Sequence, residues 1–415
     1  MKSFIEVSPD SDFPIQNLPY GVFSKPGDET RRIGVAIGDQ VLDLSAIRHL
    51  FTGPILSSQQ DVFAKPSLNA LMALGRPAWT EARETIQKLL SADEPTLRDN
   101  QELRAAALVP QADVTMHLPA EVGDYTDFYS SREHASNLGS MFRDPSNPLL
   151  PNWLHIPVGY HGRASSVVIS GTPLHRPCGQ TRPNNGPVLA CCHNRCALTG
   201  SVECGQGNVL QGMLVWLAMT SHVALESGRL STTLCREKVP PSHGALHGVY
   251  CHSHRHPALS TLDAVVPPSV VVVASEPAPL PYLKHDDPYS FDIKLSVKIV
   301  PEGGSGKVVA NTNFKHMYWT MKQQLAHHTI TGCNVRPGDL MGSGTISGTD
   351  PSAYGSMIEL SWKGTKELDV GDGEKRKFLK DGDTVVLAGH CQGDGYRVGF
   401  GQCSGKVLPA RVRVD

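Results

Sequence analysis

The chain has 415 residues, and its 38 Lys and Arg nearly balance its 40 Asp and Glu, for a formal net charge of −2. This length favours two domains, and a balanced charge without a basic run argues against a nucleic-acid partner. The N-terminus lacks the apolar core of a secretory signal, and no stretch approaches the ~18 apolar residues of a membrane helix, so a soluble, cytoplasmic protein is expected.

The N-terminal residues predict a small β-rich unit followed by helices. Two apolar runs flank Gly38 and Asp39, a pattern typical of a β-hairpin. One helix is predicted from Pro77 to Leu90, with proline at a favourable first position, and another from Thr96 to Leu108.

The rest of the chain is predicted to be strand-rich, with loops heavy in glycine and proline. Ser130 and Glu133 are spaced as a capping box, which predicts a helix from there to Gly139. Strands are predicted from alternating or apolar patterns, and one helix interrupts them; the strands are at 291–300, 356–362 and 383–390, and the helix is at 316–328. We therefore expect a small N-terminal β domain and a larger, mostly β domain of packed sheets.

A short polar stretch, "TDFYSSREHASNLGSMFR", holds the first candidate site residues. It is either a capped surface helix or the core of an active site. In the functional interpretation, His134 is a general base, because imidazole titrates nearest to neutral pH. Asp127 is then a hard oxygen ligand for Mg²⁺ or Ca²⁺, and Tyr129 and Arg143 hold an anionic substrate.

Two later segments offer partners for such a base. Strand alternation at 356–362 directs Glu359 away from the bulkiest apolar side chains, so it is a candidate acceptor that orients His134, or else an ordinary solvated glutamate. The glycine-rich segment 336–350 carries Thr345, whose hydroxyl could bind a carboxylate, although a plain turn explains the segment equally well.

Long blocks of the sequence resemble the fumarylacetoacetase family. They include "GDYTDFYSSREHASNLGSMFR", "LLPNWLHIPVGYHGRASSVVISGTP", "RPGDLMGSGTISG", "ELSWKGTK" and "GHCQGDGYRVGFGQCSGKVLPA", within about residues 1–188 and 279–415. The resemblance implies a mainly β fold with some helix: an SH3-like N-terminal domain over residues 1–118 and a β-roll catalytic domain over 119–415, assembled as a homodimer.

The same resemblance implies a reaction and roles for the candidate residues. The reaction is hydrolysis of the C–C bond of 4-fumarylacetoacetate to fumarate and acetoacetate, the last step of tyrosine and phenylalanine catabolism, assisted by Ca²⁺ and/or Mg²⁺. His134 would activate water and Glu359 would orient it, while Asp127 would bind the metal. The implied substrate-binding residues are Tyr129, Arg143, Tyr160 and Thr345.

Residues 189–278 depart from the family pattern. The family has two glutamates one residue apart and then an aspartate in this region, whereas Glu203, Glu226 and Glu237 are the only acids here from 188 to 262. Our preferred hypothesis is that this segment is mis-spliced or translated out of frame. Recovery of its peptides from the native protein by mass spectrometry would defeat that hypothesis.

Two alternatives stay open for the same segment. One is a diverged zinc-binding insert, because ligand-type side chains gather there; they are Cys192, Cys196, Cys251, His252, His254 and His256. Their spacing follows no standard zinc motif. The other is a catalytically impaired or inactive family member, since Asp127 alone cannot bind Mg²⁺ or Ca²⁺ usefully.

Overall fold

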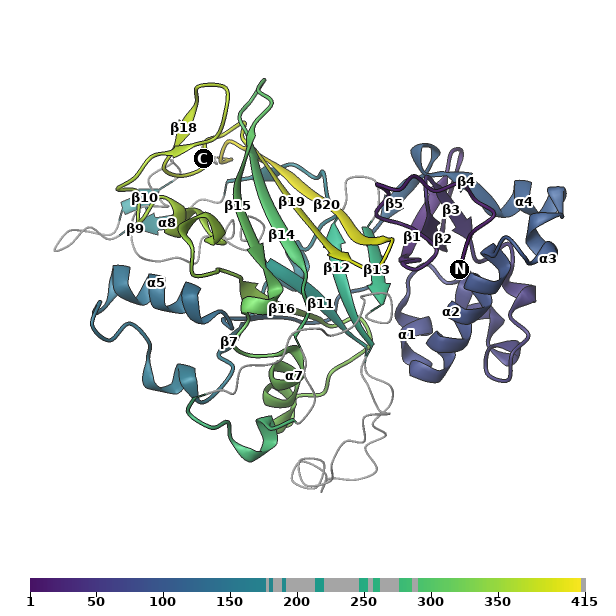
Figure 1. The fold of residues 1–415 in the computed structure, drawn as a ribbon, viewed down its shortest axis with the longest axis horizontal. Helices are drawn as coiled ribbons and strands as arrows, with labels where there is room; N and C mark the ends of the chain where they lie inside the picture. The colour runs from purple at the N-terminus through teal and green to yellow at the C-terminus, as the bar shows by residue number, and fades with distance from the viewer. Residues whose placement is uncertain are drawn as a thin grey trace.

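A computed structural model describes residues 1–176, 276–285 and 290–411, together with the backbone of strands between 179 and 261. The fold is mainly β with some helix, as predicted. In Figure 1 the N-terminal strands and helices α1 to α4 form a compact part on one side of the larger, strand-rich part.

The N-terminal strands form a small antiparallel unit around a two-residue hairpin loop. Ile37 pairs with Gln40, so Gly38 and Asp39 make the turn. Gly38 has a φ of 57°, which glycine adopts without strain. The predicted hairpin is therefore confirmed. The strands are β1 (Tyr20–Lys25), β2 (Asp28–Ile37), β3 (Gln40–Asp43), β4 (Leu108–Pro110) and β5 (Thr115–His117).

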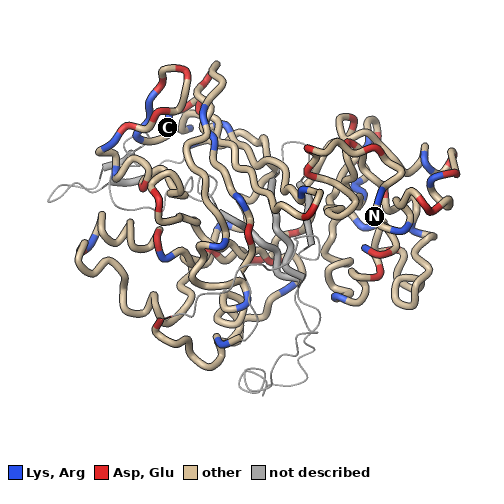
Figure 2. The backbone as a smooth tube through the Cα atoms, viewed as in Figure 1, with Lys and Arg blue, Asp and Glu red and all other residues tan. Residues whose placement is uncertain are grey.

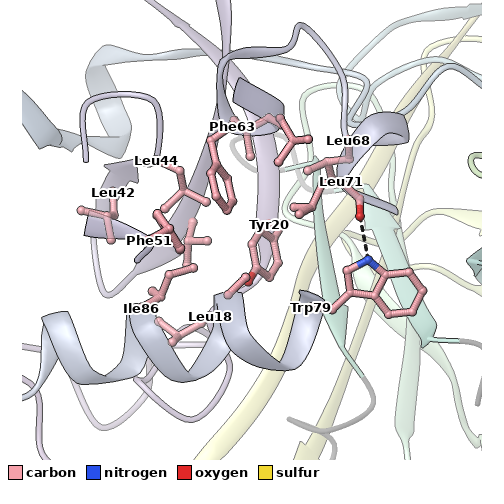
Figure 3. Packing of buried hydrophobic residues seen from close by; sticks show 14 of the residues in the cluster. Leu18, Tyr20, Leu42, Leu44, Phe51, Phe63, Leu68, Leu71, Trp79 and Ile86 are labelled. Carbon is pink, nitrogen blue, oxygen red and sulfur yellow. Dashed lines mark hydrogen bonds between the residues drawn. The ribbon is translucent and has the colours of Figure 1, made fainter. Parts of the chain in front are cut away.

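Helices bury an apolar core against these strands (Figure 3). The rings of Phe51 and Phe63 stack with centroids 4.1 Å apart. The indole N–H of the buried Trp79 donates to the carbonyl of Leu71 at 2.7 Å, so its polar atom has a partner inside the core. The elements are η1 (Arg48–Leu50), η2 (Leu56–Ser58), η3 (Gln60–Ala64), α1 (Asn69–Ala73), α2 (Arg76–Leu90), α3 (Pro95–Arg98), α4 (Gln101–Ala107) and η4 (Gln111–Asp113).

One helix prediction in this part is confirmed and one is wrong. The helix predicted from Pro77 is α2, which begins one residue earlier. The helix predicted from Thr96 to Leu108 is instead the two short helices α3 and α4. The break lies at Asn100, whose backbone is extended and whose side chain accepts a hydrogen bond from the N–H of Leu103, capping a new helix.

A long sheet joins both parts and carries candidate site residues near one end. Its order is β4-β3-β2-β1-β13-β12-β11-β16-β6-β7, with β5 on β1. Asp127 in β6 lies opposite Gly342 of the parallel strand β16 and opposite Tyr160 of the antiparallel strand β7. The further strands are β6 (Tyr125–Phe128), β7 (Gly159–His161), β11 (Met213–Met219), β12 (Leu246–His252), β13 (Pro257–Thr261) and β16 (Leu340–Thr345).

A second sheet has the order β15-β14-β19-β20-β8, and its long strands cross the larger part in Figure 1. The strands predicted at 291–300 and 383–390 are confirmed as β14 and β19. These strands are β8 (Leu174–His175), β14 (Lys294–Val300), β15 (Lys307–Asn313), β19 (Thr384–Gln392) and β20 (Arg397–Leu408); smaller ladders pair β9 (Gly179–Thr181) with β10 (Leu189–Cys191) and β17 (Leu368–Asp369) with β18 (Lys375–Arg376).

The helices of the larger part differ in detail from prediction. The helix expected from Ser130 to Gly139 is α5 (Arg132–Phe142), which is capped by Ser131. The helix expected over 316–328 is preceded by the 3₁₀ turn η9 (Phe314–His316) and starts only after the capping box of Thr320. The remaining helical elements are α7 (Met321–Ile330), α8 (Met357–Leu360), η5 (Pro151–Leu154), η6 (Ala164–Ser166), η8 (Pro281–Leu283) and η10 (Pro351–Ala353).

Charged residues of both signs are interspersed along the described trace (Figure 2). None of the helices formed by the described residues is long and apolar enough to cross a membrane.

Candidate active site

His134 and Glu359 form a buried hydrogen-bonded pair. His134 lies in the first turn of α5, where the hydroxyl of Ser131 accepts a hydrogen bond from its backbone N–H at 3.4 Å. Its side chain is only 5% exposed, and its Nδ1 lies 2.7 Å from Oε2 of Glu359, 225 positions away in the sequence. The structure thus brings the predicted base and its predicted acceptor together; their roles in catalysis stay predictions.

Both carboxylate oxygens of Glu359 accept further hydrogen bonds. Asn137 donates to Oε1 at 2.9 Å, Ser356 donates to Oε2 at 2.6 Å, and Ser347 lies 2.9 and 3.0 Å from the two oxygens. Burial by itself raises the pKa of Glu359, but the charge and hydrogen bond of His134, with the other donors, outweigh burial and hold this pKa below its usual value.

These donors decide which nitrogen of His134 carries the proton. Ser347 accepts the N–H of Gly355 at 3.0 Å, so its own hydroxyl proton is free to point at Glu359. An ionised carboxylate only accepts hydrogen bonds, so Nδ1 of His134 must be the donor to it. In the neutral ring Nε2 then holds the lone pair, which is the state that a general base needs.

The predicted strand at 356–362 is wrong, because Glu359 lies in the single-turn helix α8. The helix ends in a Schellman motif, in which the N–H of Lys363 donates to the carbonyl of Ile358 and the N–H of Trp362 to that of Glu359. Trp362 has a φ of 46° at the position where glycine is usual. The turn thereby fixes the backbone of Glu359 at the cost of a strained tryptophan.

Asp127 is a buried carboxylate with one satisfied oxygen. The phenol of Tyr160 donates to Oδ2 at 2.7 Å, whereas Oδ1 is buried and has no hydrogen-bond partner among the described residues. Burial raises the pKa of Asp127 to about 6, while the hydrogen bond from Tyr160 and the charges of His134 and Arg163 act in the opposite direction. An acceptor left unpaired in this way is suited to a ligand.

Of the remaining candidates, Tyr129 lies beside His134, and Arg143 lies near Tyr129. The ring of Tyr129 meets that of His134 edge-on, with centroids 5.3 Å apart. Burial raises the pKa of Tyr129, and the nearby guanidinium of Arg143 lowers it. Arg143 is otherwise exposed and donates to the carbonyl of Pro148 at 2.8 Å. Thr345, at the end of β16, is buried, and in the described chain its hydroxyl has no hydrogen-bond partner.

Sequence reasoning missed the three side chains that hold Glu359. Asn137 follows His134 by three positions, so a helical pattern places both on one face, and this signal could have identified it. Ser347 and Ser356 lie in a glycine- and serine-rich loop, where nothing in the sequence distinguishes them from turn residues.

Asp127 offers a divalent cation a buried, hard oxygen atom that has no hydrogen-bond partner among the described residues. The described residues include no group of three or more His, Cys, Asp or Glu side chains that could hold a metal ion. Because Mg²⁺ and Ca²⁺ take six or more oxygen ligands, Asp127 alone would not complete a site for either ion.

The other ligand-type residues singled out from the sequence lie outside the described side chains. They are Glu203, Glu226, Glu237, Cys192, Cys196, Cys251, His252, His254 and His256. The zinc interpretation and the reading-frame hypothesis for 189–278 therefore stay predictions.

A mainly β protein with a buried imidazole–carboxylate pair beside an unpaired carboxylate oxygen has the features of an enzyme that activates water by general-base catalysis. Comparison with known families places the chain among hydrolases. Residues 16–119 match the model for the fumarylacetoacetase N-terminal region, and residues 124–408 match that for the fumarylacetoacetate (FAA) hydrolase C-terminal region. The chain belongs to the fumarylacetoacetate hydrolase family, a family of enzymes.

Individual relatives match from end to end. The chain is 55% identical to fumarylacetoacetase of Homo sapiens, over 98% of this chain and 99% of that protein. It is 52% identical to the Caenorhabditis elegans protein of the same name, over 99% and 100%, and 46% identical to that of Arabidopsis thaliana, over 99% of each. Because these matches cover nearly the whole of each chain, residues 189–278 are comparable in length to the corresponding part of the relatives.

Proposed function

We propose that this chain hydrolyses the C–C bond of fumarylacetoacetate to fumarate and acetoacetate, the last step of tyrosine and phenylalanine catabolism. The observation that carries the proposal is the buried hydrogen bond between His134 and Glu359. It supplies an oriented general base in a chain that is 55% identical to a fumarylacetoacetase.

In the proposed reaction, Nε2 of His134 takes a proton from water, and the resulting hydroxide adds to the carbonyl next to the fumaryl group. The bond between this carbonyl carbon and the neighbouring methylene carbon then breaks, and its electron pair leaves with acetoacetate as an enolate. The imidazolium then gives its proton to the methylene carbon of the enolate, so the neutral imidazole base is regenerated. Glu359 stabilises the imidazolium that exists between these two steps.

Four residues are proposed to bind the substrate. Arg143 can bind a terminal carboxylate through its fork of donors, and Tyr129 lies close enough to share this task. Thr345 brings a hydroxyl that has no partner in the described chain. Tyr160 is half exposed and already orients Asp127. Holding both ends of the diketo acid lowers the entropic part of the barrier.

Asp127 is proposed to bind Ca²⁺ or Mg²⁺, with further ligands from outside the described residues. Such an ion, when bound, acts as a Lewis acid that stabilises negative charge on a dicarbonyl oxygen. The unpaired Oδ1 and its burial support this assignment.

Replacing Asp127 with asparagine is expected to raise the melting temperature in EDTA, because a buried, unpaired charged oxygen costs more than the about 1–3 kcal/mol of an unpaired neutral group such as an amide. The amide oxygen can still accept the hydrogen bond of Tyr160. The same variant is expected to lose the stabilisation that millimolar Ca²⁺ or Mg²⁺ gives the unmodified chain. Thermal unfolding with EDTA and with each ion measures both effects.

Asp144→Asn is the matched control, since Asp144 is an exposed acid in the turn after α5. It should keep the full response to the cation. If Asp127→Asn also kept that response, Asp127 would not be a metal ligand.

The direct test of the proposed function is a turnover assay. Purified protein is mixed with fumarylacetoacetate and Ca²⁺ or Mg²⁺, and loss of diketone absorbance is followed together with release of fumarate. Formation of both products in equal amounts is expected. Absence of turnover from a folded protein that binds the cation would overturn the proposal.

A catalytically impaired family member is the alternative function, and the scarcity of acids between 188 and 262 favours it. Such a chain would fold, but it would neither bind Ca²⁺ nor turn over the substrate.

We further propose that the chain forms a homodimer, which analytical ultracentrifugation can test. We also propose that it divides into two domains at residue 118, which limited proteolysis can test. Family membership supports these proposals.

A further inference from the structure

Ser347 touches the carboxylate of Glu359 with a hydroxyl whose direction is fixed. Its Oγ lies 2.9 Å from Oε1 and 3.0 Å from Oε2. Because Oγ also accepts the N–H of Gly355 at 3.0 Å, its proton must point toward the carboxylate. Ser347 is fully buried, so water cannot take over this bond.

The backbone of the same residue holds the helix that carries His134. The N–H of Ser347 donates to Oγ of Ser131 at 3.2 Å, and the Ser131 hydroxyl donates to the carbonyl of Ser347 at 3.3 Å. Ser131 is the N-cap of α5, and its Oγ accepts the backbone N–H of His134. A single residue therefore contacts the carboxylate of Glu359 directly and is linked through the N-cap Ser131 to the backbone of His134.

We propose that Ser347 is a positioning residue for the His134–Glu359 pair, which fixes the carboxylate through its hydroxyl and the N-terminus of α5 through its backbone. The expected change in kcat rests on the proposed function, whereas the expected change in the titration of the His134–Glu359 pair does not.

Loss of the hydroxyl has a defined electrostatic effect. Glu359 would keep the bonds of Asn137 and Ser356 but lose a donor shared by both oxygens. A carboxylate with fewer donors binds protons more tightly, so the pKa of Glu359 rises and its hold on the imidazole proton strengthens. The titration midpoint of the pair should then move to higher pH by about one unit.

The test compares Ser347→Ala with the unmodified chain by ¹⁵N NMR of histidine-labelled protein as a function of pH. The ring signals of His134 are assigned with His134→Asn. Ser347→Ala is expected to raise the midpoint by about one unit, and in the assay to lower kcat by about 10- to 100-fold with little change in KM. Ser352→Ala is the matched control, because Ser352 is exposed on the same loop and, among the described residues, its side chain bonds only Asp350.

A lower melting temperature with an unchanged midpoint would show a merely structural role and overturn the proposal. If Ser347→Ala failed to fold, Ser347→Cys, which nearly keeps the volume but donates weakly, should show the same upward shift, and an unshifted midpoint would again overturn it. The NMR titration needs no turnover. An inactive unmodified chain would defeat the proposed function and leave this test intact.

Discussion

Replacing His134 with asparagine is expected to lower kcat for fumarylacetoacetate by about 10²- to 10⁴-fold, the range that a positioned general base contributes. The amide nitrogen of asparagine can take the place of Nδ1 and still donate to Glu359, so the buried carboxylate keeps its partner. What is lost is Nε2, the atom proposed to accept the proton of water. Steady-state kinetics should show the loss in kcat, with KM almost unchanged.

His161→Asn is the control for this experiment. His161 lies next to Tyr160 in β7, but its ring is exposed and its Nε2 bonds Asp124 rather than Glu359. It should retain activity within a few-fold. Equal losses in the two variants would mean that His134 has no special role, and an undiminished rate in His134→Asn would remove the proposed base altogether.

Local patterns predicted the elements that depend on neighbouring residues. The hairpin at Gly38 needs only a two-residue turn between apolar runs, and α2 needs only a proline start and helical periodicity. The strands β14 and β19 follow from alternation. The break at Asn100 was missed because an asparagine cap interrupts a pattern that otherwise continues through both helices.

The segment around Glu359 shows why pattern alone failed. Apolar residues at 358, 360 and 362 alternate as in a strand. The helix α8 has only four residues, which are too few for the sequence to separate a period of 2 from one of 3.6. The left-handed backbone of Trp362 ends the turn, and no propensity predicts tryptophan there. Ser347 lies 216 positions from Ser131, the N-cap of α5, so this contact could not be inferred without the fold.

Replacing Glu359 with glutamine is expected to lower kcat by about 10²- to 10⁴-fold while leaving His134 in place. The neutral amide of glutamine cannot stabilise the imidazolium as the carboxylate does. Its NH₂ group must also face side chains that now donate to the carboxylate, among them Asn137. If this NH₂ faces the imidazole, Nδ1 becomes an acceptor and the proton moves to Nε2, the wrong tautomer for a base. The pH profile of kcat and the histidine ring signals measure both effects.

The stability of the same variant should depend on pH in a defined direction. The folded-state pKa of Glu359 lies below the ordinary value of 4.5, so its carboxylate stabilises the fold above that pH and loses this contribution as the pH falls through the folded value. Glu359→Gln should therefore cost more stability at neutral pH than below pH 4.5. Glu133→Gln, a change in the neighbouring half-buried acid whose pKa burial raises, should show the opposite trend. If the difference in free energy of unfolding between Glu359→Gln and the unmodified chain did not change with pH, the buried carboxylate would not be ionised. The orientation of His134 would then need another explanation.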